Sequence, residues 1–208
     1  SDEVVAHTRE VLCYPDQPPL VLDRPKPRVP PEWYIPYEDT PHGVPPMASF
    51  GSGYRYHVTG LIHDVRGFPT HRPEEIVAFR RRLARKLDQH LDDIITYETY
   101  EATDADLLVI AYGSVVRAAR RAVKDARAKG LKVGLLQLLT LWPFPDKILE
   151  LFLIRVKAVL VPELNQGQVF REVQRVNQGE TRVKLLSRID GQLITPGEIL
   201  NYLFKASS

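Results

Sequence analysis

The sequence has few cysteines and almost no net charge. Cys13 is the only cysteine among 208 residues, which excludes an internal disulfide and a cluster site built wholly from cysteines of this chain. The formal net charge is +2, so the charge balance alone indicates neither a nucleic-acid nor a membrane partner. No apolar run approaches the roughly 20 residues that span a bilayer, and the first residues show no secretory pattern. We therefore expect a cytoplasmic protein that binds no nucleic acid and no membrane.

Proline is concentrated in residues 1–50. This stretch holds 11 of the 17 prolines, a density that forbids a long helix or a central strand. Apolar side chains that could anchor the stretch lie among the prolines: Leu20, Val21, Leu22, Trp33, Tyr34, Ile35, Tyr37 and Phe50. The combination predicts a Pro-rich extended arm that packs over a neighbouring surface. A flexible tail is the alternative interpretation.

A strand, a turn and a helix are predicted between residues 51 and 103. Residues 54–62 alternate and are rich in β-forming side chains, which is typical of a strand, and a polar turn follows at 63–70. Residues 73–90 begin with a proline and two glutamates and repeat apolar side chains at helical spacing, so they predict an amphipathic helix. We interpret 51–103 as a connector packed on the next domain.

From residue 104 onward, strand-like and helix-like segments alternate. Strands are predicted at residues 105–111, 131–137, 158–162 and 182–186. Helices are predicted at residues 114–129, 146–152 and 166–177, and from Thr195 or Pro196 toward the end. Units of about 30 residues imply right-handed crossovers and a parallel sheet. The fold class is therefore α/β, and residues 104–208 are expected to form a small three-layer domain.

The run Trp142-Pro143-Phe144-Pro145 follows one of the predicted strands. Two prolines two residues apart cannot continue a helix, and each pushes the residue before it toward extended geometry. The segment is thus a stiff loop that carries two large aromatic rings out of the carboxyl end of a strand. That end of a parallel sheet is where ligands and partners usually bind. The rings either cap the domain's own core or form a functional surface.

Two further segments lie at strand ends. Residues 112–114 form a strand-to-helix turn, but they lack the glycine spacing of a dinucleotide site and the lysine of a phosphate loop, so Ser114 is interpreted as a helix N-cap. The interpretation as a small nucleotide-binding protein is supported only by this turn and by the fold class, and fold analogy is weak evidence. Glu163 and Asn165 follow a later strand, where they either point into a cleft or interface, or, in the case of Asn165, cap the next helix.

The turn at 63–70 and the segment 114–132 carry the remaining polar candidates. His63 and Asp64 lie near His57, but their spacing matches no zinc pattern, so we interpret them as hydrogen-bonded turn residues or as contacts to a partner or cofactor. Residues 114–132 are basic with one opposing aspartate, which indicates a solvated helix face or a surface for an acidic protein. No aromatic residues interleave with these charges, which argues against nucleic acid.

Six segments together resemble the alpha subunit of 2-oxoacid:ferredoxin oxidoreductases, and the 2-oxoglutarate type matches best. They are residues 54–61, His63-Asp64, 66–70, 112–114, 139–145 and 163–168. The resemblance covers essentially the whole chain. Residues 1–9 resemble the tail of the family's pyrimidine-binding domain, so 1–50 is expected to hold the end of an upstream domain followed by the arm. Residues 104–208 resemble its transketolase C-terminal-like domain.

The resemblance implies a complex that oxidatively decarboxylates a 2-oxoacid to acyl-CoA with thiamine diphosphate and passes the electrons to ferredoxin. The family's substrate-contacting motifs, Tyr-Pro-Ile-Thr-Pro and Arg-Gly-Gly-Pro-Ser-Thr-Gly, do not occur here. One cysteine cannot hold a four-iron cluster, and the Gly-Asp-Gly motif of a diphosphate and Mg²⁺ site is also missing. We therefore assign no catalytic, cofactor-binding or metal-binding residue to this chain.

The chain is thus expected to be the C-terminal part of such a subunit, a fragment that is inactive alone and packs against the missing upstream alpha domains and the beta subunit. The predicted interface residues are Trp142, Phe144, His63, Asp64, Arg66, Glu163 and Asn165. Ferredoxin and CoA are expected to act on the whole complex. The alternative is a stand-alone interaction module that uses the basic segment 114–132 and the Pro-rich arm.

Overall fold

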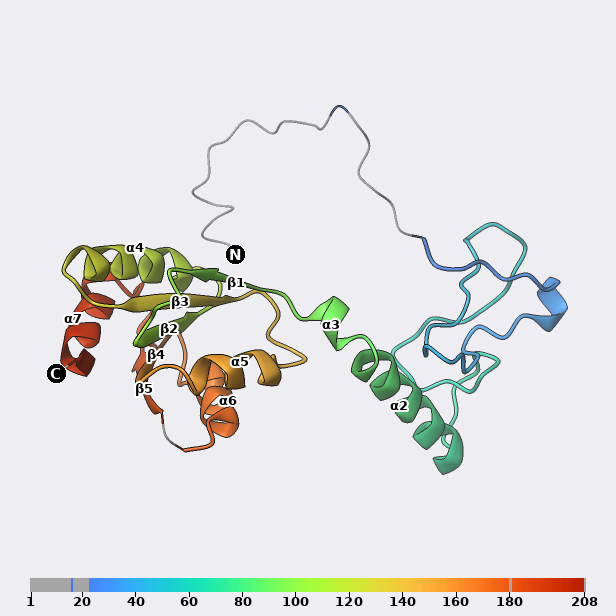
Figure 1. Cartoon of the computed structure of the whole chain (residues 1–208). Coiled ribbons are helices and arrows are strands. Elements are labelled where there is room, and N and C mark those ends of the chain that lie inside the picture. Colours follow the sequence, from blue (N-terminus) through green and yellow to red (C-terminus); the bar gives the residue numbers. More distant parts are fainter. Residues whose placement is uncertain (1–15, 17–22, 180, 208) are drawn as a thin grey trace. The chain divides into compact units, whose positions relative to one another are not determined.

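The computed structural model describes residue 16, residues 23–179 and residues 181–207 (Figure 1). The chain divides into two compact units. The first, here called the C-terminal unit, comprises the described residues from Asp93 onward, and the second, here called the arm unit, comprises the described residues up to Asp92. The predicted tail at residues 1–9 and the apolar anchors Leu20, Val21 and Leu22 lie outside the described residues.

A five-stranded sheet forms the centre of the C-terminal unit, in the order β1-β3-β2-β4-β5. The strands are β1 (Tyr97–Tyr100), β2 (Leu107–Ala111), β3 (Val133–Leu138), β4 (Ala158–Glu163) and β5 (Arg182–Ser187). Strands β2 to β5 are mutually parallel, as predicted, whereas β1 pairs antiparallel with β3 at the edge. The sequence reasoning did not predict β1, because its four residues are mostly exposed and lack an apolar alternation.

Helices cover both faces of this sheet, which confirms the predicted three-layer α/β class (Figure 1). The helices are α4 (Val115–Ala128) and α7 (Pro196–Ser207) on one face, and α5 (Asp146–Leu153) and α6 (Gln168–Val176) on the other. Alternate residues of β2 enter different cores: Val109 packs with α4 and α7, and Leu108 with α5 and α6. Every residue of β2 and β4 is buried, because a strand covered on both faces has no solvated side.

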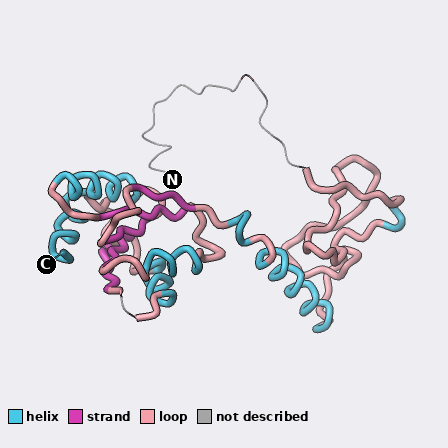
Figure 2. Tube along the Cα trace, viewed as in Figure 1, coloured by secondary structure: helices cyan, strands magenta, loops and turns pink. Residues whose placement is uncertain are grey.

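The arm unit has little regular structure in its described residues (Figure 2). Its elements are a 3₁₀ turn, η1 (Pro31–Trp33), the helix α2 (Pro73–Asp88) and the short α3 (Leu91–Ile94), which crosses the unit boundary. The helix α2 begins at Pro73 and carries glutamates in its first turn and cations in its last, which suits the helix dipole. No helix in the described ranges is long and apolar enough to cross a bilayer.

The predicted strand at residues 54–62 is wrong. These residues form no strand, and the only bridge beside them pairs His63 with Pro69. Their tyrosines bond the proline-rich arm instead: the Tyr54 hydroxyl donates to the Val29 carbonyl at 2.6 Å, and the Tyr56 hydroxyl donates to the Ala48 carbonyl at 3.0 Å. Prolines lack the N–H groups that a strand ladder requires, so side-chain hydroxyls make the contacts that a second strand would otherwise make.

We predict that Gly134→Ala destabilises the C-terminal unit. A Cβ at Gly134 in β3 would lie 2.6 Å from the Ala102 Cα and 2.9 Å from the Glu101 carbonyl oxygen, and this backbone cannot move aside cheaply. The expected loss is about 1–3 kcal/mol in the free energy of unfolding, measured by urea denaturation. Gly197→Ala in α7 is the matched control, because its added methyl meets open space and should stabilise slightly or do nothing. Equal midpoints for the two variants would contradict the packing argument.

Candidate functional site

The loops that follow the four parallel strands gather at one edge of the sheet, here called the carboxyl edge. They are residues 112–114 after β2, 139–145 after β3, 164–167 after β4 and 188–195 after β5. The edge therefore brings together the residues that the sequence singled out at strand ends: Tyr112, Trp142, Phe144, Glu163 and Asn165.

Glu163, the last residue of β4, is wholly buried at 0% exposure. Its carboxylate accepts the backbone N–H groups of Val169 at 3.0 Å and Phe170 at 2.8 Å, in the first turn of α6. It also accepts the Tyr112 hydroxyl at 3.0 Å and the Asn165 amide at 3.2 Å. A negative charge at a helix N-terminus satisfies N–H groups that have no helical partner and interacts favourably with the helix dipole. The burial of this carboxylate is thus compensated within the chain.

Asn165 organises the turn between β4 and α6. Its side-chain oxygen accepts the backbone N–H groups of Gly167 at 2.8 Å and Gln168 at 3.0 Å, while its amide also donates to the Tyr112 hydroxyl at 2.8 Å. Gly167 has φ 86°, and a Cβ there would lie 2.8 Å from Leu185, so the tight turn requires glycine. Glu163 and Asn165 therefore both have partners inside the chain, and their role at an interface stays a prediction.

Tyr112 was singled out only as part of the 112–114 turn, and its hydrogen bonds to Glu163 and Asn165 were not predicted from the sequence. Burial, followed by the adjacent charge of Glu163, raises the pKa of the Tyr112 hydroxyl from 10.0 to about 12. The signal for it was available, because β2 and β4 are neighbours and the residues at their carboxyl ends therefore lie close together. Ser114 is at the N-cap position of α4, as predicted, but its side chain makes no capping hydrogen bond.

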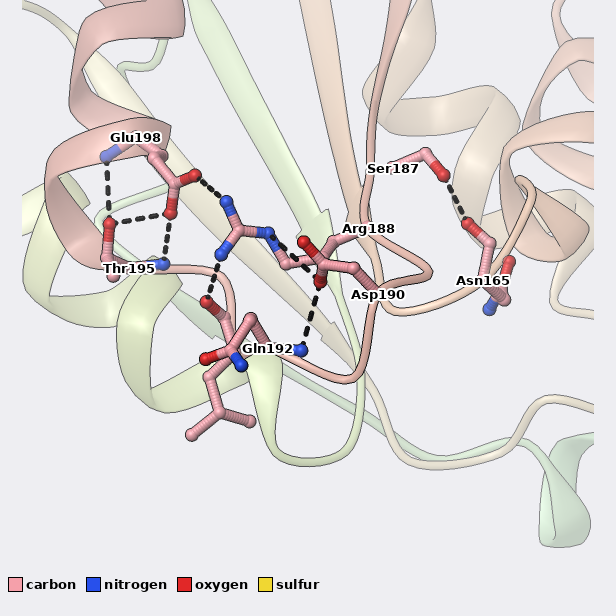
Figure 3. A network of polar contacts seen from close by, with 8 residues as sticks. Asn165, Ser187, Arg188, Asp190, Gln192, Thr195 and Glu198 are labelled. Atoms are coloured by element: carbon pink, nitrogen blue, oxygen red, sulfur yellow. Dashed lines mark hydrogen bonds and ion pairs between the residues drawn. The ribbon is translucent and has the colours of Figure 1, made fainter.

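A second polar network closes the loop between β5 and α7 (Figure 3). Arg188 forms an ion pair with Glu198 and donates to the Leu193 carbonyl at 3.0 Å. Glu198 accepts the backbone N–H and the hydroxyl of Thr195, and the Thr195 hydroxyl accepts the Glu198 N–H at 3.3 Å, which is a reciprocal capping box. The hydrogen bonds from Thr195 and, to a smaller extent, the charge of Arg188 lower the pKa of Glu198. Ser187 joins the two networks by donating to the Asn165 carbonyl at 2.6 Å.

The two rings of the stiff loop after β3 have different environments. Trp142 is 73% exposed. Phe144 is half-buried against the core beneath α5 and α6, and the Arg175 guanidinium lies 5.9 Å from the centre of its ring. Arg175 is held there by Asp146 at 2.6 Å. One ring therefore caps the domain's own core, and the other faces solvent in this chain.

A cleft of about 380 Å³ lies at the carboxyl edge beside the starts of α4 and α7. Leu164, Leu193 and Ile194 contribute apolar lining, and Arg117 is the one charged residue among the described residues that line it. The nearby carboxylate of Glu163 is fully covered, and Tyr112 donates to it. The cleft therefore presents a mainly apolar lining, and Glu163 is not exposed at this edge.

The other predicted site residues belong to the arm unit. His63 is 3% exposed, stacks on Tyr37 with ring centres 5.1 Å apart, and has its Nε2 2.9 Å from the Thr59 hydroxyl. Asp64 accepts the backbone N–H of Arg66 at 2.9 Å, and Arg66 itself is exposed. In the described part of the chain, no group of three or more His, Cys, Asp or Glu could hold a metal ion.

Three of the seven cations in the basic segment 114–132 form ion pairs with the chain's own carboxylates. Its ion pairs are Arg120–Glu98 at 3.8 Å, Arg121–Asp125 at 2.9 Å and Arg127–Asp104 at 2.5 Å. Arg127 also donates to the carbonyls of Val133 and Glu101, and the bond to Asp104 raises its pKa. Arg127 therefore joins α4 to the sheet, which reduces the charge available to an acidic partner.

We predict that Tyr112 contributes a pH-dependent part of stability. The unfolded hydroxyl has a pKa near 10.0 and the folded one about 12, so the contribution is complete below pH 10 and is lost as the pH rises toward 12. The free energy of unfolding, measured with urea at several pH values, should fall across this window. Tyr112→Phe should remove this part of the slope, and Glu163→Gln should reduce it, since it removes the nearby charge. Tyr97→Phe, on the exposed strand β1, is the control, and an effect equal to that of Tyr112→Phe would contradict the assignment.

Comparison with known proteins places this geometry in a family. The family model described as pyruvate:ferredoxin oxidoreductase core domain II matches residues 105–199. The 2-oxoglutarate synthase subunit KorA of Methanothermobacter thermautotrophicus is 42% identical over 98% of the chain and 54% of its own length. The corresponding protein of Methanocaldococcus jannaschii is 38% identical over 96% of the chain and 53% of its own length. The chain thus spans about half the length of the curated relatives that it matches.

A solved structure agrees with these sequence matches. The structure described as 2-oxoglutarate:ferredoxin oxidoreductase from Magnetococcus marinus with 2-oxoglutarate, coenzyme A and succinyl-CoA bound superposes with a TM-score of 0.78 at 27% identity. The match covers 91% of this chain and 33% of that one. The family resemblance expected from the sequence is confirmed, and the chain belongs to the alpha-subunit family of the 2-oxoacid:ferredoxin oxidoreductases.

Proposed function

We propose that this chain is the C-terminal part of the alpha subunit of a 2-oxoacid:ferredoxin oxidoreductase, with 2-oxoglutarate as the substrate. The enzyme would oxidatively decarboxylate the 2-oxoacid to its acyl-CoA and reduce ferredoxin. The observation that carries the proposal is the identity of 42% to a 2-oxoglutarate synthase subunit over nearly the whole chain. The similar solved structure, described with 2-oxoglutarate, coenzyme A and succinyl-CoA bound, supports the same substrate.

Within that enzyme, the proposed role of this chain is structural and interface-forming. The buried carboxylate at the carboxyl edge is used to hold α6, and the cleft beside α4 and α7 is mainly apolar. The described residues provide no ligand set for Mg²⁺ or for an iron–sulfur cluster, so they do not fit those groups. Thiamine diphosphate, Mg²⁺ and the cluster are therefore assigned to other domains or subunits. The proposed cellular location is the cytoplasm.

The proposed partners are the beta subunit and the upstream domains of the alpha subunit. Trp142 supports this proposal, because an exposed tryptophan on a stiff loop is a typical anchor at the centre of an interface. Leu139 and Leu141 on the same loop are also exposed, so the apolar surface extends beyond one ring. Phe144 packs against the core of the domain and would thereby hold the loop in place while these side chains face solvent.

We predict that the isolated chain has no 2-oxoacid oxidoreductase activity. Purified chain with 2-oxoglutarate, CoA, thiamine diphosphate, Mg²⁺ and methyl viologen should give no substrate-dependent dye reduction, because the family's substrate-contacting motifs do not occur in its sequence. The control is the complete alpha subunit assembled with its beta subunit, which should reduce the dye with 2-oxoglutarate. Robust reduction by the isolated chain would refute the structural role, and inactivity of the assembled enzyme would refute the proposed reaction.

We also predict that Trp142→Ala weakens association without weakening the fold. Since tryptophan anchors commonly contribute 2 kcal/mol or more, the affinity of the chain for the purified upstream alpha domain and beta subunit should drop at least about tenfold. Its free energy of unfolding should change by less than about 0.5 kcal/mol, because the ring is exposed. Affinity is measured by biolayer interferometry and stability by urea denaturation.

Ile154→Ala is the matched control for this experiment. Ile154 is 81% exposed and lies between α5 and β4, at the opposite edge of the sheet from Trp142. Its truncation removes a comparable exposed apolar side chain and should leave the affinity unchanged. An equal loss of affinity for both variants would argue against the carboxyl edge as the interface.

A further inference from the structure

The arm unit contains a cavity of about 420 Å³, built entirely from its own residues. Its size lies within the range of pockets for small organic ligands, roughly 300–1,000 Å³. Aromatic rings form much of its wall, contributed by Tyr34, Tyr37, Tyr56 and Phe79. Its charged lining residues are Arg24, Arg82 and Lys86, and none of the described residues that line it is acidic.

Arg82 is the unusual residue of this cavity, because it is 6% exposed and yet incompletely bonded. One nitrogen of its guanidinium donates to the Gly43 carbonyl at 3.0 Å, and the group lies 5.4 Å from the centre of the Phe79 ring. Within the described residues, its remaining N–H groups have no hydrogen-bond acceptor, although an arginine offers five donors. Burial, with a contribution from Arg24, lowers the pKa of Arg82. The unbonded nitrogens of Arg82 are not among the fully buried unpartnered atoms of the described residues, so a ligand can reach them, and an anion there would stabilise a cation that is largely withdrawn from water.

The carboxylates closest to Arg82 have other partners. A smaller cavity of about 100 Å³ on another side of Arg82 is lined by Asp39, Asp64 and Glu75. Asp39 is paired with Arg85, Asp64 accepts backbone N–H groups of its own turn, and Glu75 accepts the Thr70 hydroxyl and pairs with Arg72. The charge of Asp39 opposes the lowering of the Arg82 pKa but does not reverse it. The donors of Arg82 are therefore available to a ligand.

Lys86 adds a second cation one helical turn along α2. Residues at i and i+4 lie on the same face of a helix, and two like charges there repel each other. The Lys86 ammonium makes no hydrogen bond or ion pair in the part of the chain that the structure describes. Two neighbouring cations at one cavity, one of them buried, are stabilised together by a single oxyanion that accepts from both.

The geometry around these cations is fixed by close packing. Gly43 has φ 70°, and a Cβ there would lie 2.9 Å from the Lys86 Cβ and 3.0 Å from the Arg82 carbonyl, so the loop lies directly on α2. Arg24 secures the same loop by donating to the Pro45 carbonyl at 2.7 Å. The hydroxyls of Tyr34 and Tyr56 bond the carbonyls of Pro46 and Ala48, which positions the aromatic wall. The cavity is thus preformed without a ligand.

We propose that this cavity binds a small organic anion, with its phosphate or carboxylate held by Arg82 and Lys86 and its planar or apolar body against the aromatic wall. The residues Tyr34, Tyr56 and Phe79 offer ring surface to such a body. The proposal does not depend on the reaction of the complete enzyme, because every residue of the site lies in the arm unit.

The test is calorimetric titration of the full chain with two probes that carry both features, AMP for a phosphate head and phthalate for a carboxylate head. At least one should bind saturably, and adenosine, which has no charged head, should bind at least about tenfold more weakly than AMP if AMP binds. Arg82→Met should weaken the bound probe by about tenfold to a hundredfold, because it removes a charged hydrogen bond. Lys86→Met should weaken it in the same direction and breaks no bond that the fold uses.

Arg81→Met is the matched control, since it removes the same charge from an exposed position on α2. Thermal melting followed by circular dichroism establishes whether each variant is folded. If Arg82→Met does not fold, the binding measured for Lys86→Met tests the proposal. The proposal is overturned if neither probe binds saturably, if Arg81→Met weakens binding as much as Lys86→Met, or if adenosine binds as well as AMP. It is also overturned if triglutamate binds in an Arg82-dependent way while both probes fail, because the site would then receive a protein carboxylate.

Discussion

The buried carboxylate of Glu163 holds together three segments that are distant in the sequence. It accepts from the end of β2 through Tyr112, from the β4–α6 turn through Asn165, and from the first turn of α6. Because an uncompensated buried charge is strongly unfavourable, each of these donors has to be in place for the others to stay. The carboxyl edge is therefore rigid where a catalytic edge would keep a titratable group exposed. That rigidity suits the interface role proposed for this edge.

At the same edge, the two aromatic rings of the loop after β3 have different environments. Phe144 and the Arg175–Asp146 pair attach the loop to the core, while Trp142 projects into solvent. A projecting aromatic side chain keeps its binding geometry at low entropic cost only if its backbone is already fixed. The division between one anchored ring and one exposed ring meets that condition. Phe144 follows the core-capping interpretation, whereas a functional surface at Trp142 stays a prediction.

The sequence predicted the parts of the fold that rest on continuous apolar runs. Strands β2, β3 and β4 are buried on both faces, so their continuous apolar runs identify them, whereas β5 is only partly buried. Strand β1 was missed, because a short edge strand takes its pairing from its neighbour and not from its own pattern. Residues 54–62 were predicted as a strand from real alternation, but their neighbours are prolines that cannot complete a ladder. At the carboxyl edge, Glu163 and Asn165 were identified, whereas Tyr112, Arg188 and Glu198 act through contacts that form only after folding.

The antiparallel edge strand β1 also has a consequence for how the protein behaves at high concentration. Strand β3, next to this edge of the sheet, is almost entirely apolar, and without β1 beside it β3 would present a row of unpaired N–H and C=O groups. Such a row is a template for intermolecular β-pairing and aggregation. Strand β1 occupies it over Tyr97 to Tyr100, and its outward residues include the charged Glu98, which discourages a further strand from joining. Four mostly exposed residues that contribute little to the core therefore keep the most apolar strand edge of this unit from recruiting other molecules.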